Sequence, residues 1–220
     1  MDIKILGLVR GLFAGNYPDG DENKQLTINN RGDQLVVQAL PELTELVRLG
    51  GSWQVMLATG IAALTAVPTT VAGLSLWNGE AGGGPCYAID SFGSVEAVVD
   101  ATQADPTALF AMNNVAPVAA PTATALTIRG MSGNVYGGKA RPVTTLTVTN
   151  DGWFPHGAEA QTPLAPAVAG AIWKVNEVKA RGQYLVKPGG MFNINAVKLA
   201  AAAAQQFFFI RWHEVQIIVR

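Results

Sequence analysis

The chain has 220 residues and a formal net charge of −1 at pH 7, with 14% charged and 49% hydrophobic residues. An average soluble protein has roughly 25% charged residues, so this composition predicts that much of the exterior is buried between subunits. The alternative is a monomer with a surface rich in threonine, asparagine and glycine. Lysine and arginine are scattered along the chain, which argues against direct nucleic-acid binding. The lone cysteine, Cys86, excludes an intrachain disulfide and a cysteine-based zinc site, and we interpret it as a small buried apolar residue.

No segment has the character of a signal peptide or a membrane helix. The apolar run at the start of the chain is too short for a signal peptide, and the second residue, Asp2, is acidic. The most apolar long stretch, Val55–Ser75, is interrupted by Gly60, Pro68 and Gly73. The sequence therefore predicts synthesis in a cytosol and no membrane partner.

Residues 1–50 differ from the rest of the chain. They contain a polar, turn-rich segment, Asp19–Lys24, and a short apolar run, Leu35–Leu40. Pro41–Arg48 predicts two helical turns, because proline suits the first helical position and the glycine pair that follows ends a helix. This stretch has little apolar content for a core of its own. We therefore expect an N-terminal arm over residues 1–50 and a separate domain over residues 51–220.

The second part of the chain has the pattern of an all-β domain. Short apolar or alternating stretches are separated by turns rich in glycine and proline. Thr145, Thr147 and Thr149 alternate with Leu146 and Val148, as expected for a strand with one solvent-exposed face. About ten short strands at this spacing predict a β-sandwich with a jelly-roll-like fold. The predicted strands are Trp53–Thr59, Ala62–Val67, Gly73–Asn78, Pro85–Val99, Thr107–Asn113, Ala125–Gly130, Thr144–Asn150, Ala171–Lys179, Gln183–Val186, Met191–Val197 and Gln206–Val219.

The last predicted strand is long, and its apolar residues change parity. On one parity lie Phe208, Ile210 and Trp212. On the other lie Val215, Ile217 and Val219. Because one regular strand cannot bury both sets on one face, we expect a bulge near His213. The first set is then predicted in the sandwich core, and the second is predicted to face another element or another subunit.

Few residues suggest catalysis. His156 lies in Asp151–Gly157, which we interpret as a loop with an aromatic cluster at a surface or interface. A triad with Ser132 would need a nucleophile elbow, and the Gly-x-Ser-x-Gly spacing is missing. His213 is expected to make a structural hydrogen bond within its strand. Gly137–Ala140 lacks the hydroxyl residue and the following helix of a phosphate-binding loop. The sequence therefore does not predict an enzyme.

The chain also predicts no metal site and no cofactor site. Asp19–Asn23 has carboxylates two residues apart, like the start of a calcium loop. However, Lys24 and Asn30 occupy the positions where that loop requires glycine and glutamate. The five tryptophans are spread along the whole chain, which favours core or interface anchors over a carbohydrate platform.

Three stretches of the chain carry a family resemblance. They are the opening Gly11–Asn16 followed by Leu35–Gln38, the strand and turn Leu76–Gly82 leading into Tyr87–Ser91, and the closing Phe207–Val219. In style and order, over about two-thirds of the chain, they resemble a loosely defined group of tailed-bacteriophage virion proteins. The resemblance implies a capsid decoration or cement protein, commonly a jelly-roll trimer, or a tail or fibre component. It implies no catalytic residues.

The leading hypothesis is therefore a virion structural protein, made in the host cytoplasm, that stabilises the phage head as a decoration or cement protein. We expect a homotrimer that binds the major capsid protein or another virion protein. The alternative is a phage tail or fibre protein that binds a host receptor or glycan through the aromatic residues around His156. The candidate interface residues are Leu35, Val37, Trp153, Phe154, Val215, Ile217 and Val219.

Overall fold

The computed structural model describes residues 46–98, 107–114, 121–122, 126–159, 172–198 and 205–216 of the chain. All of these residues belong to one compact unit, Pro41–Arg220. The other unit, Met1–Leu40, lies outside the described residues. The predicted arm also lies outside them, except for residues 46–50.

Those last residues of the predicted arm form the end of a helix. Leu46–Arg48 is helical. The Gly50 amide donates to the Val47 carbonyl oxygen, and the Gly51 amide donates to the Leu46 carbonyl oxygen, each at 3.0 Å. Gly50 has a φ of 77°, which glycine adopts without strain, and this bonding pattern is a Schellman end. The predicted glycine stop is therefore confirmed.

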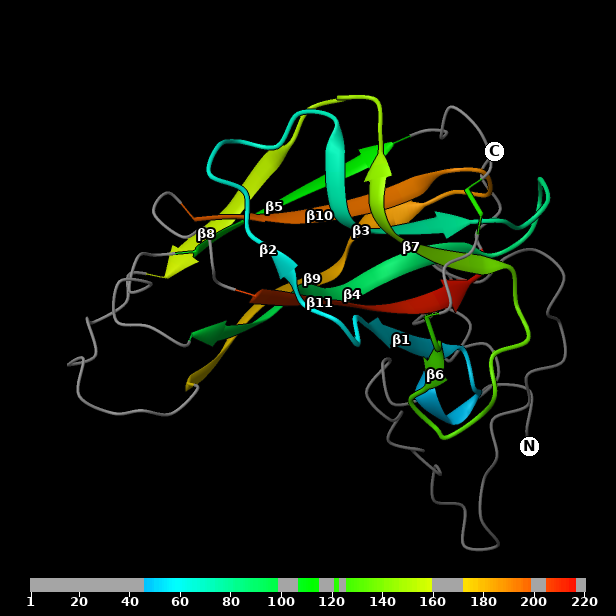
Figure 1. Ribbon diagram of the computed structural model, residues 1–220. Helices are drawn as coiled ribbons and strands as arrows, with labels where there is room; N and C mark the ends of the chain where they lie inside the picture. The colour runs from blue at the N-terminus through cyan, green and yellow to red at the C-terminus, as the bar shows by residue number, and fades with distance from the viewer. Residues whose placement is uncertain are drawn as a thin grey trace, which may run out of the picture. The chain divides into compact units, whose positions relative to one another are not determined.

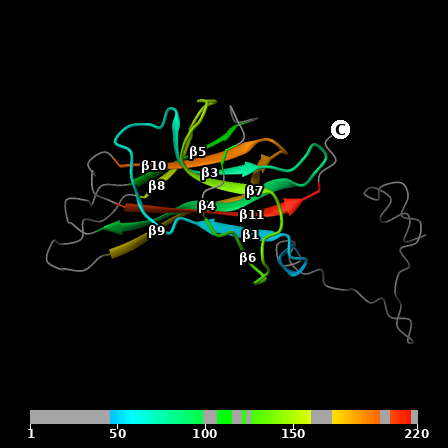
Figure 2. The same ribbon diagram turned by 45° about the vertical axis from the view of Figure 1, so that its right-hand side comes forward.

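The described strands form two antiparallel sheets that pack face to face (Figures 1 and 2). Sheet I contains β1 (Ser52–Met56), β2 (Ile61–Ala62), β4 (Cys86–Val98), β6 (Arg129–Gly130), β9 (Ile172–Val186) and β11 (Gln205–Val215). Sheet II contains β3 (Val71–Asn78), β5 (Thr107–Asn114), β7 (Ala140–Thr147), β8 (Phe154–Glu159) and β10 (Met191–Val197).

The strand order is that of a jelly roll. Sheet I has the order β6-β1-β11-β4-β9, with β2 beside β11, and sheet II has the order β7-β3-β10-β5-β8. When β2, β6 and β7 are set aside, the first, eighth, third and sixth remaining strands form one sheet. The second, seventh, fourth and fifth form the other. The predicted all-β, jelly-roll-like sandwich is confirmed.

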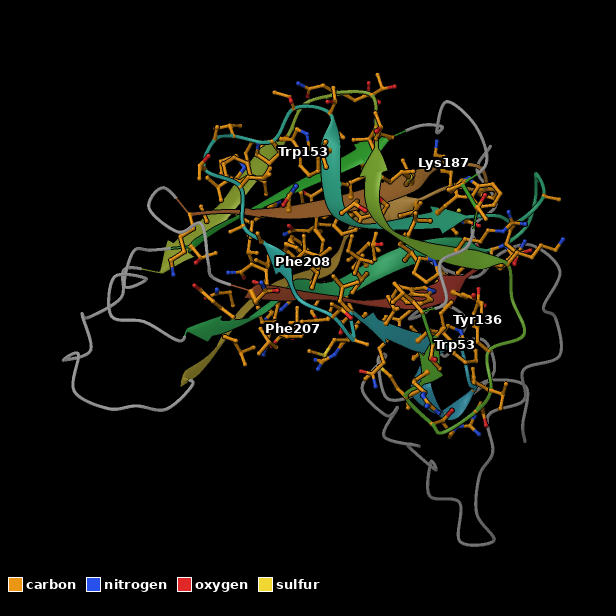
Figure 3. All side chains as sticks on the ribbon, viewed as in Figure 1. Trp53, Tyr136, Trp153, Lys187, Phe207 and Phe208 are labelled. Atoms are coloured by element: carbon orange, nitrogen blue, oxygen red, sulfur yellow. The ribbon has the colours of Figure 1, made fainter. Side chains whose placement is uncertain are left out.

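The core lies between the sheets and is built from alternate residues of each strand. Strand β11 contributes Phe208, Ile210 and Trp212, all fully buried, as predicted. Phe192 of β10 belongs to the same cluster from the opposite sheet. Figure 3 shows Phe208 between the two layers and Phe207 on the opposite side of β11. Because side chains alternate across a strand, a run of three phenylalanines must put rings on both faces of sheet I.

The prediction of a bulge near His213 in the closing strand was wrong, because the irregularity lies in its partner strand, β4. The register of β11 against β4 shifts between Arg211 and Trp212 rather than at His213. The extra residue is Asp90 of β4, which lies between the two residues that pair with Arg211 and Trp212. The closing strand itself stays regular, and its partner carries the irregularity.

Several features of the predicted strand pattern were wrong. The predicted strands Ala62–Val67 and Ala125–Gly130 are replaced by the two-residue strands β2 and β6. The stretches Ala171–Lys179 and Gln183–Val186 form one strand, β9, which bends at Arg181 and Gly182, where φ is 48° and 78°. The segment Asp151–Gly157 is not only a loop, because its second half belongs to β8, which pairs with β5. Pro155 is tolerated in β8, because β8 is an edge strand.

Candidate interface surfaces and polar sites

The outer face of sheet I carries an apolar patch, which we call the outer patch. Its members are Met56, Val95, Val175, Phe207 and Phe209, contributed by four strands. In the strand register Met56 pairs with Phe209, Phe207 with Val95, and Val95 with Val175. Met56 is 47% exposed and Val175 is 58% exposed. The patch is therefore one continuous apolar surface, and not a set of scattered apolar residues.

Phe209 is the centre of this patch. It pairs with Gly93 in the register, and its ring lies over the glycine. A Cβ atom at Gly93 would collide with the Asn176 carbonyl oxygen and with the Phe209 ring, so only glycine fits there. The Arg211 guanidinium lies 5.5 Å from the Phe209 ring centroid and pairs with Glu177 at 3.1 Å. An apolar centre beside an exposed ion pair resembles the core and rim of a protein interface.

The outer face of sheet II, in contrast, is covered by the chain itself. A second apolar cluster forms there from Ala72, Met112, Val148 and Met191, and Trp153 packs against it. Val148 and Trp153 belong to the segment that joins β7 to β8. The Trp153 indole N–H donates to the Thr69 carbonyl oxygen at 2.9 Å, and Figure 3 shows this residue above sheet II. Trp153, a candidate interface residue, is thus held against its own sandwich.

A hydrogen-bonded row of polar side chains crosses the same covered face. The Ser75 hydroxyl donates to the Asn193 side-chain oxygen at 2.6 Å. The Asn193 side-chain nitrogen donates to the Asn114 side-chain oxygen at 2.5 Å. Asn114 in turn donates to the Thr149 carbonyl oxygen at 3.0 Å and to the Asp151 carboxylate. The row therefore ties the β7–β8 segment to three strands of sheet II.

An aromatic cluster joins the edge strands β8 and β9 of the two sheets. Phe154 is 64% exposed, whereas His156 is half-buried. The His156 Nε2 atom lies 2.5 Å from the Tyr184 hydroxyl, and its ring meets Phe92 edge-on at 5.2 Å. Burial lowers the pKa of His156 and raises the pKa of Tyr184. Both groups are therefore held neutral near pH 7, and a neutral imidazole nitrogen can accept a hydrogen bond from the tyrosine hydroxyl.

Glu214 is an acidic residue at an inward-facing position of β11. It was not predicted as a site residue from the sequence. The Tyr136 hydroxyl donates to its carboxylate at 2.9 Å. Tyr136 packs edge-on against Trp53 at 4.8 Å, as Figure 3 shows. Burial raises the pKa of Glu214, the Tyr136 bond opposes that shift, and nearby Glu80 adds to it. Glu214 explains why the apolar parity ends after Trp212.

The candidate interface residues predicted from the sequence lie in different environments. Leu35, Val37, Ile217 and Val219 lie outside the described residues. Val215 is the last residue of β11, half-buried, and pairs with Cys86. Trp153 and Phe154 are neighbours in sequence but diverge, because the first packs on sheet II and the second is exposed. The outer patch was missed, although the run Phe207–Phe209 was a usable signal.

Among the residues that the structure describes, no group of three or more His, Cys, Asp or Glu side chains could hold a metal ion. No helix in that part of the chain is long and apolar enough to cross a membrane. No protein-family model, curated protein or solved structure matches the chain. The resemblance to phage virion proteins therefore stays a prediction.

Proposed function

We propose that this chain is a virion structural protein, a capsid decoration or cement protein that acts as a homotrimer on a phage head. Jelly rolls occur in viral capsid proteins, lectins and cupins, so the fold alone does not decide the function. The observation that supports an assembly role is the unequal covering of the two outer faces. Sheet II is covered by its own chain, while sheet I presents the outer patch.

Burial of the outer patch would supply the binding free energy. Apolar area removed from water contributes about 25 cal/mol per Å² before the costs of association are deducted. The low charge content of the chain fits a protein whose exterior is partly buried in an assembly. In this role the patch contacts a second copy of the chain, and the remaining exterior contacts the major capsid protein or another virion protein.

The experiment that tests this function is the composition of purified particles. Density-gradient-purified virions should contain the chain in stoichiometric amounts, and particle imaging should place it on the head. Light scattering of the isolated protein at micromolar concentration should report a trimer. A chain that is absent from purified particles would remove both the decoration role and the tail role.

A tail or fibre protein that binds a host receptor or glycan is the second candidate. The supporting observation is the exposed ring of Phe154 beside the His156–Tyr184 pair at the β8–β9 edge. An exposed aromatic ring is a suitable stacking surface for a sugar. Glycan-array binding that is lost in Phe154→Ala, with particle imaging that places the chain on the tail, would favour this candidate over the first.

A further inference from the structure

Six polar side chains lie buried between the sheets, close to the point where β2 pairs with β11. We call them the internal polar cluster: Ser94, Glu96, Thr107, Asn176, Lys198 and Gln206. Each is at least nine-tenths buried. Neither the proposed function nor the core packing uses them, and burial of so many polar groups requires a specific reason.

The centre of the cluster is an ion pair that spans the sandwich. The Lys198 Nζ atom contacts the Glu96 Oε1 atom, and neither side chain has exposed surface. Lys198 follows β10 of sheet II, and Glu96 belongs to β4 of sheet I. The Thr107 hydroxyl donates to the other carboxylate oxygen of Glu96 at 2.7 Å.

Asn176 lies next to this pair on the inner face of sheet I. In the register of β4 and β9, Ser94 pairs with Asn176 and Glu96 pairs with Lys174, so Asn176 is the diagonal neighbour of Glu96. Such diagonal neighbours are about 7 Å apart, within reach of long side chains. Both polar atoms of the Asn176 carboxamide lack a hydrogen-bond partner among the described residues. A buried lysine thus contacts a buried carboxyl group whose diagonal neighbour across the strands is an unpartnered carboxamide.

We propose that Lys198 and Asn176 form an intramolecular isopeptide bond, with Glu96 as the catalytic acid and base. Glu96 takes one proton from the Lys198 ammonium, and the resulting amine attacks the Asn176 Cγ atom and forms the new C–N bond. Glu96 then delivers that proton to the leaving nitrogen and accepts the second proton from the attacking nitrogen. The original C–N bond of the carboxamide breaks, and one ammonia molecule leaves. Atoms and charge balance without an oxidant or a co-reactant.

Two further members of the cluster suit the same reaction. Ser94 is the direct cross-strand neighbour of Asn176, and Gln206 is the direct neighbour of Glu96. The Ser94 hydroxyl and the Gln206 amide have no hydrogen-bond partner among the described residues. Each can donate to the oxyanion that develops on the Asn176 side-chain oxygen, as preorganised donors do in acyl transfer. Thr107 acts as a positioning residue, because it holds the Glu96 carboxyl group.

The bond would tie edge strand β9 of sheet I to the end of β10 in sheet II. These two segments belong to different layers and have no strand pairing with each other. A covalent link between them restricts the unfolded chain and resists separation of the sheets. This inference does not depend on the proposed virion role, and its test is separate from particle composition.

Intact-mass spectrometry of the purified full-length protein is the test. The expected mass is lower than the sequence mass by one ammonia molecule. Trypsin should fail to cleave after Lys198, and a branched peptide should join Val175–Lys179 to the segment that ends at Arg211. Lys198→Met, Asn176→Ala and Glu96→Gln should each restore the full sequence mass. Asn176→Asp should instead lose the mass of one water molecule, because the leaving group changes.

Asn195→Asp is the matched control, since Asn195 is a buried asparagine whose side chain already donates to the Val71 carbonyl oxygen. It should keep the loss of ammonia. A wild-type protein with the full sequence mass and normal cleavage after Lys198 would overturn the proposal. Ordered water bonded to Asn176 and Gln206 in a crystal structure, with separate Lys198 and Asn176 side chains, would overturn it equally.

Discussion

The two sheets of this sandwich are built from similar strands, but the apolar residues on their outer faces are covered on one sheet and partly exposed on the other. Sheet II has its outer face covered by the β7–β8 segment, which brings Val148 and Trp153 onto an apolar cluster. It also carries a hydrogen-bonded polar row centred on Asn193. Sheet I has apolar residues on its outer face as well, but Met56 and Val175 remain exposed there.

This difference separates apolar surface that stabilises the fold from apolar surface that is available to a partner in the proposed assembly. On sheet II the polar row is hydrogen-bonded and the apolar cluster is covered, so that face stabilises the monomer. On sheet I, Phe209 is buried beside Arg211, whereas Met56 and Val175 at the margins of the patch are exposed. Exposed apolar area of this kind is typical of interaction sites.

Neighbouring residues of β11 allow the stability contribution of the core to be compared with that of the outer face. Phe208→Ala should lower the free energy of unfolding by about 3–5 kcal/mol, because it empties a fully buried position between the sheets. Phe207→Ala, its immediate neighbour on the outer face, should cost far less. Denaturant unfolding followed by tryptophan fluorescence measures both. Equal losses for the two variants would mean that the outer patch is part of the monomer core.

The polar row on sheet II should be the next most sensitive feature. Asn193→Ala removes the side-chain partner of the Ser75 hydroxyl and of the Asn114 side-chain oxygen, and each unpaired buried group costs about 1–3 kcal/mol. The loss should appear as reduced thermal stability together with faster hydrogen exchange in the β7–β8 segment. Asn113→Ala is the matched control, because Asn113 is exposed on the same sheet. A harmless Asn193→Ala would show that the row does not hold the covering segment.

A substitution in the outer patch should affect self-association more than the free energy of unfolding. Val175→Glu should change the free energy of unfolding by no more than about 0.5 kcal/mol, as surface substitutions do, but should weaken self-association. Val135→Glu is the control, because Val135 is 92% exposed and lies outside the patch. Analytical ultracentrifugation over a concentration series compares the two variants. Self-association that survives in Val175→Glu would remove the outer patch from the interface.

The fold could be predicted because the alternation of apolar residues and the glycine- and proline-rich turns indicate where the strands lie and which side chains face inward. The inward residues of β11, Phe208, Ile210 and Trp212, follow directly from period-two alternation. Strand β8 could not be predicted, because Pro155 and the neighbouring glycines resemble a loop until an edge position explains them. The bend at Arg181 was also hidden, since a left-handed arginine leaves no mark in the apolar pattern.

The sites were harder to predict than the strands. Trp153 and Phe154 look equivalent in sequence, and only the path of the β7–β8 segment decides that one is covered and the other exposed. Lys198 and Glu96 are far apart in the chain, so their pairing depends on the stacking of the two sheets. Side-chain identity alone carries no signal for such long-range contacts.

The smallest expected effect concerns pH and the half-buried Glu214. Its pKa in the folded state is raised above the ordinary value of 4.5, mainly by burial, so the folded state binds the proton more readily than the unfolded state. The contribution of this group to stability should therefore grow as pH falls from the raised value toward 4.5, and should be constant below that range. Among the described residues, Tyr136, Glu80, Trp53, Trp212 and Tyr87 interact with it.

Glu214→Gln isolates this effect, because the amide can still accept the Tyr136 hydrogen bond but does not titrate. The difference in the free energy of unfolding between wild type and variant should shift in favour of wild type as pH is lowered through this window. Urea unfolding at closely spaced pH values measures the difference. Because the site is half exposed, this change in the free energy of unfolding should be smaller than the change in the free energy of self-association caused by Val175→Glu. A pH-independent difference would show that burial does not perturb this carboxyl group, and that this end of the sandwich admits water as freely as the outer patch does.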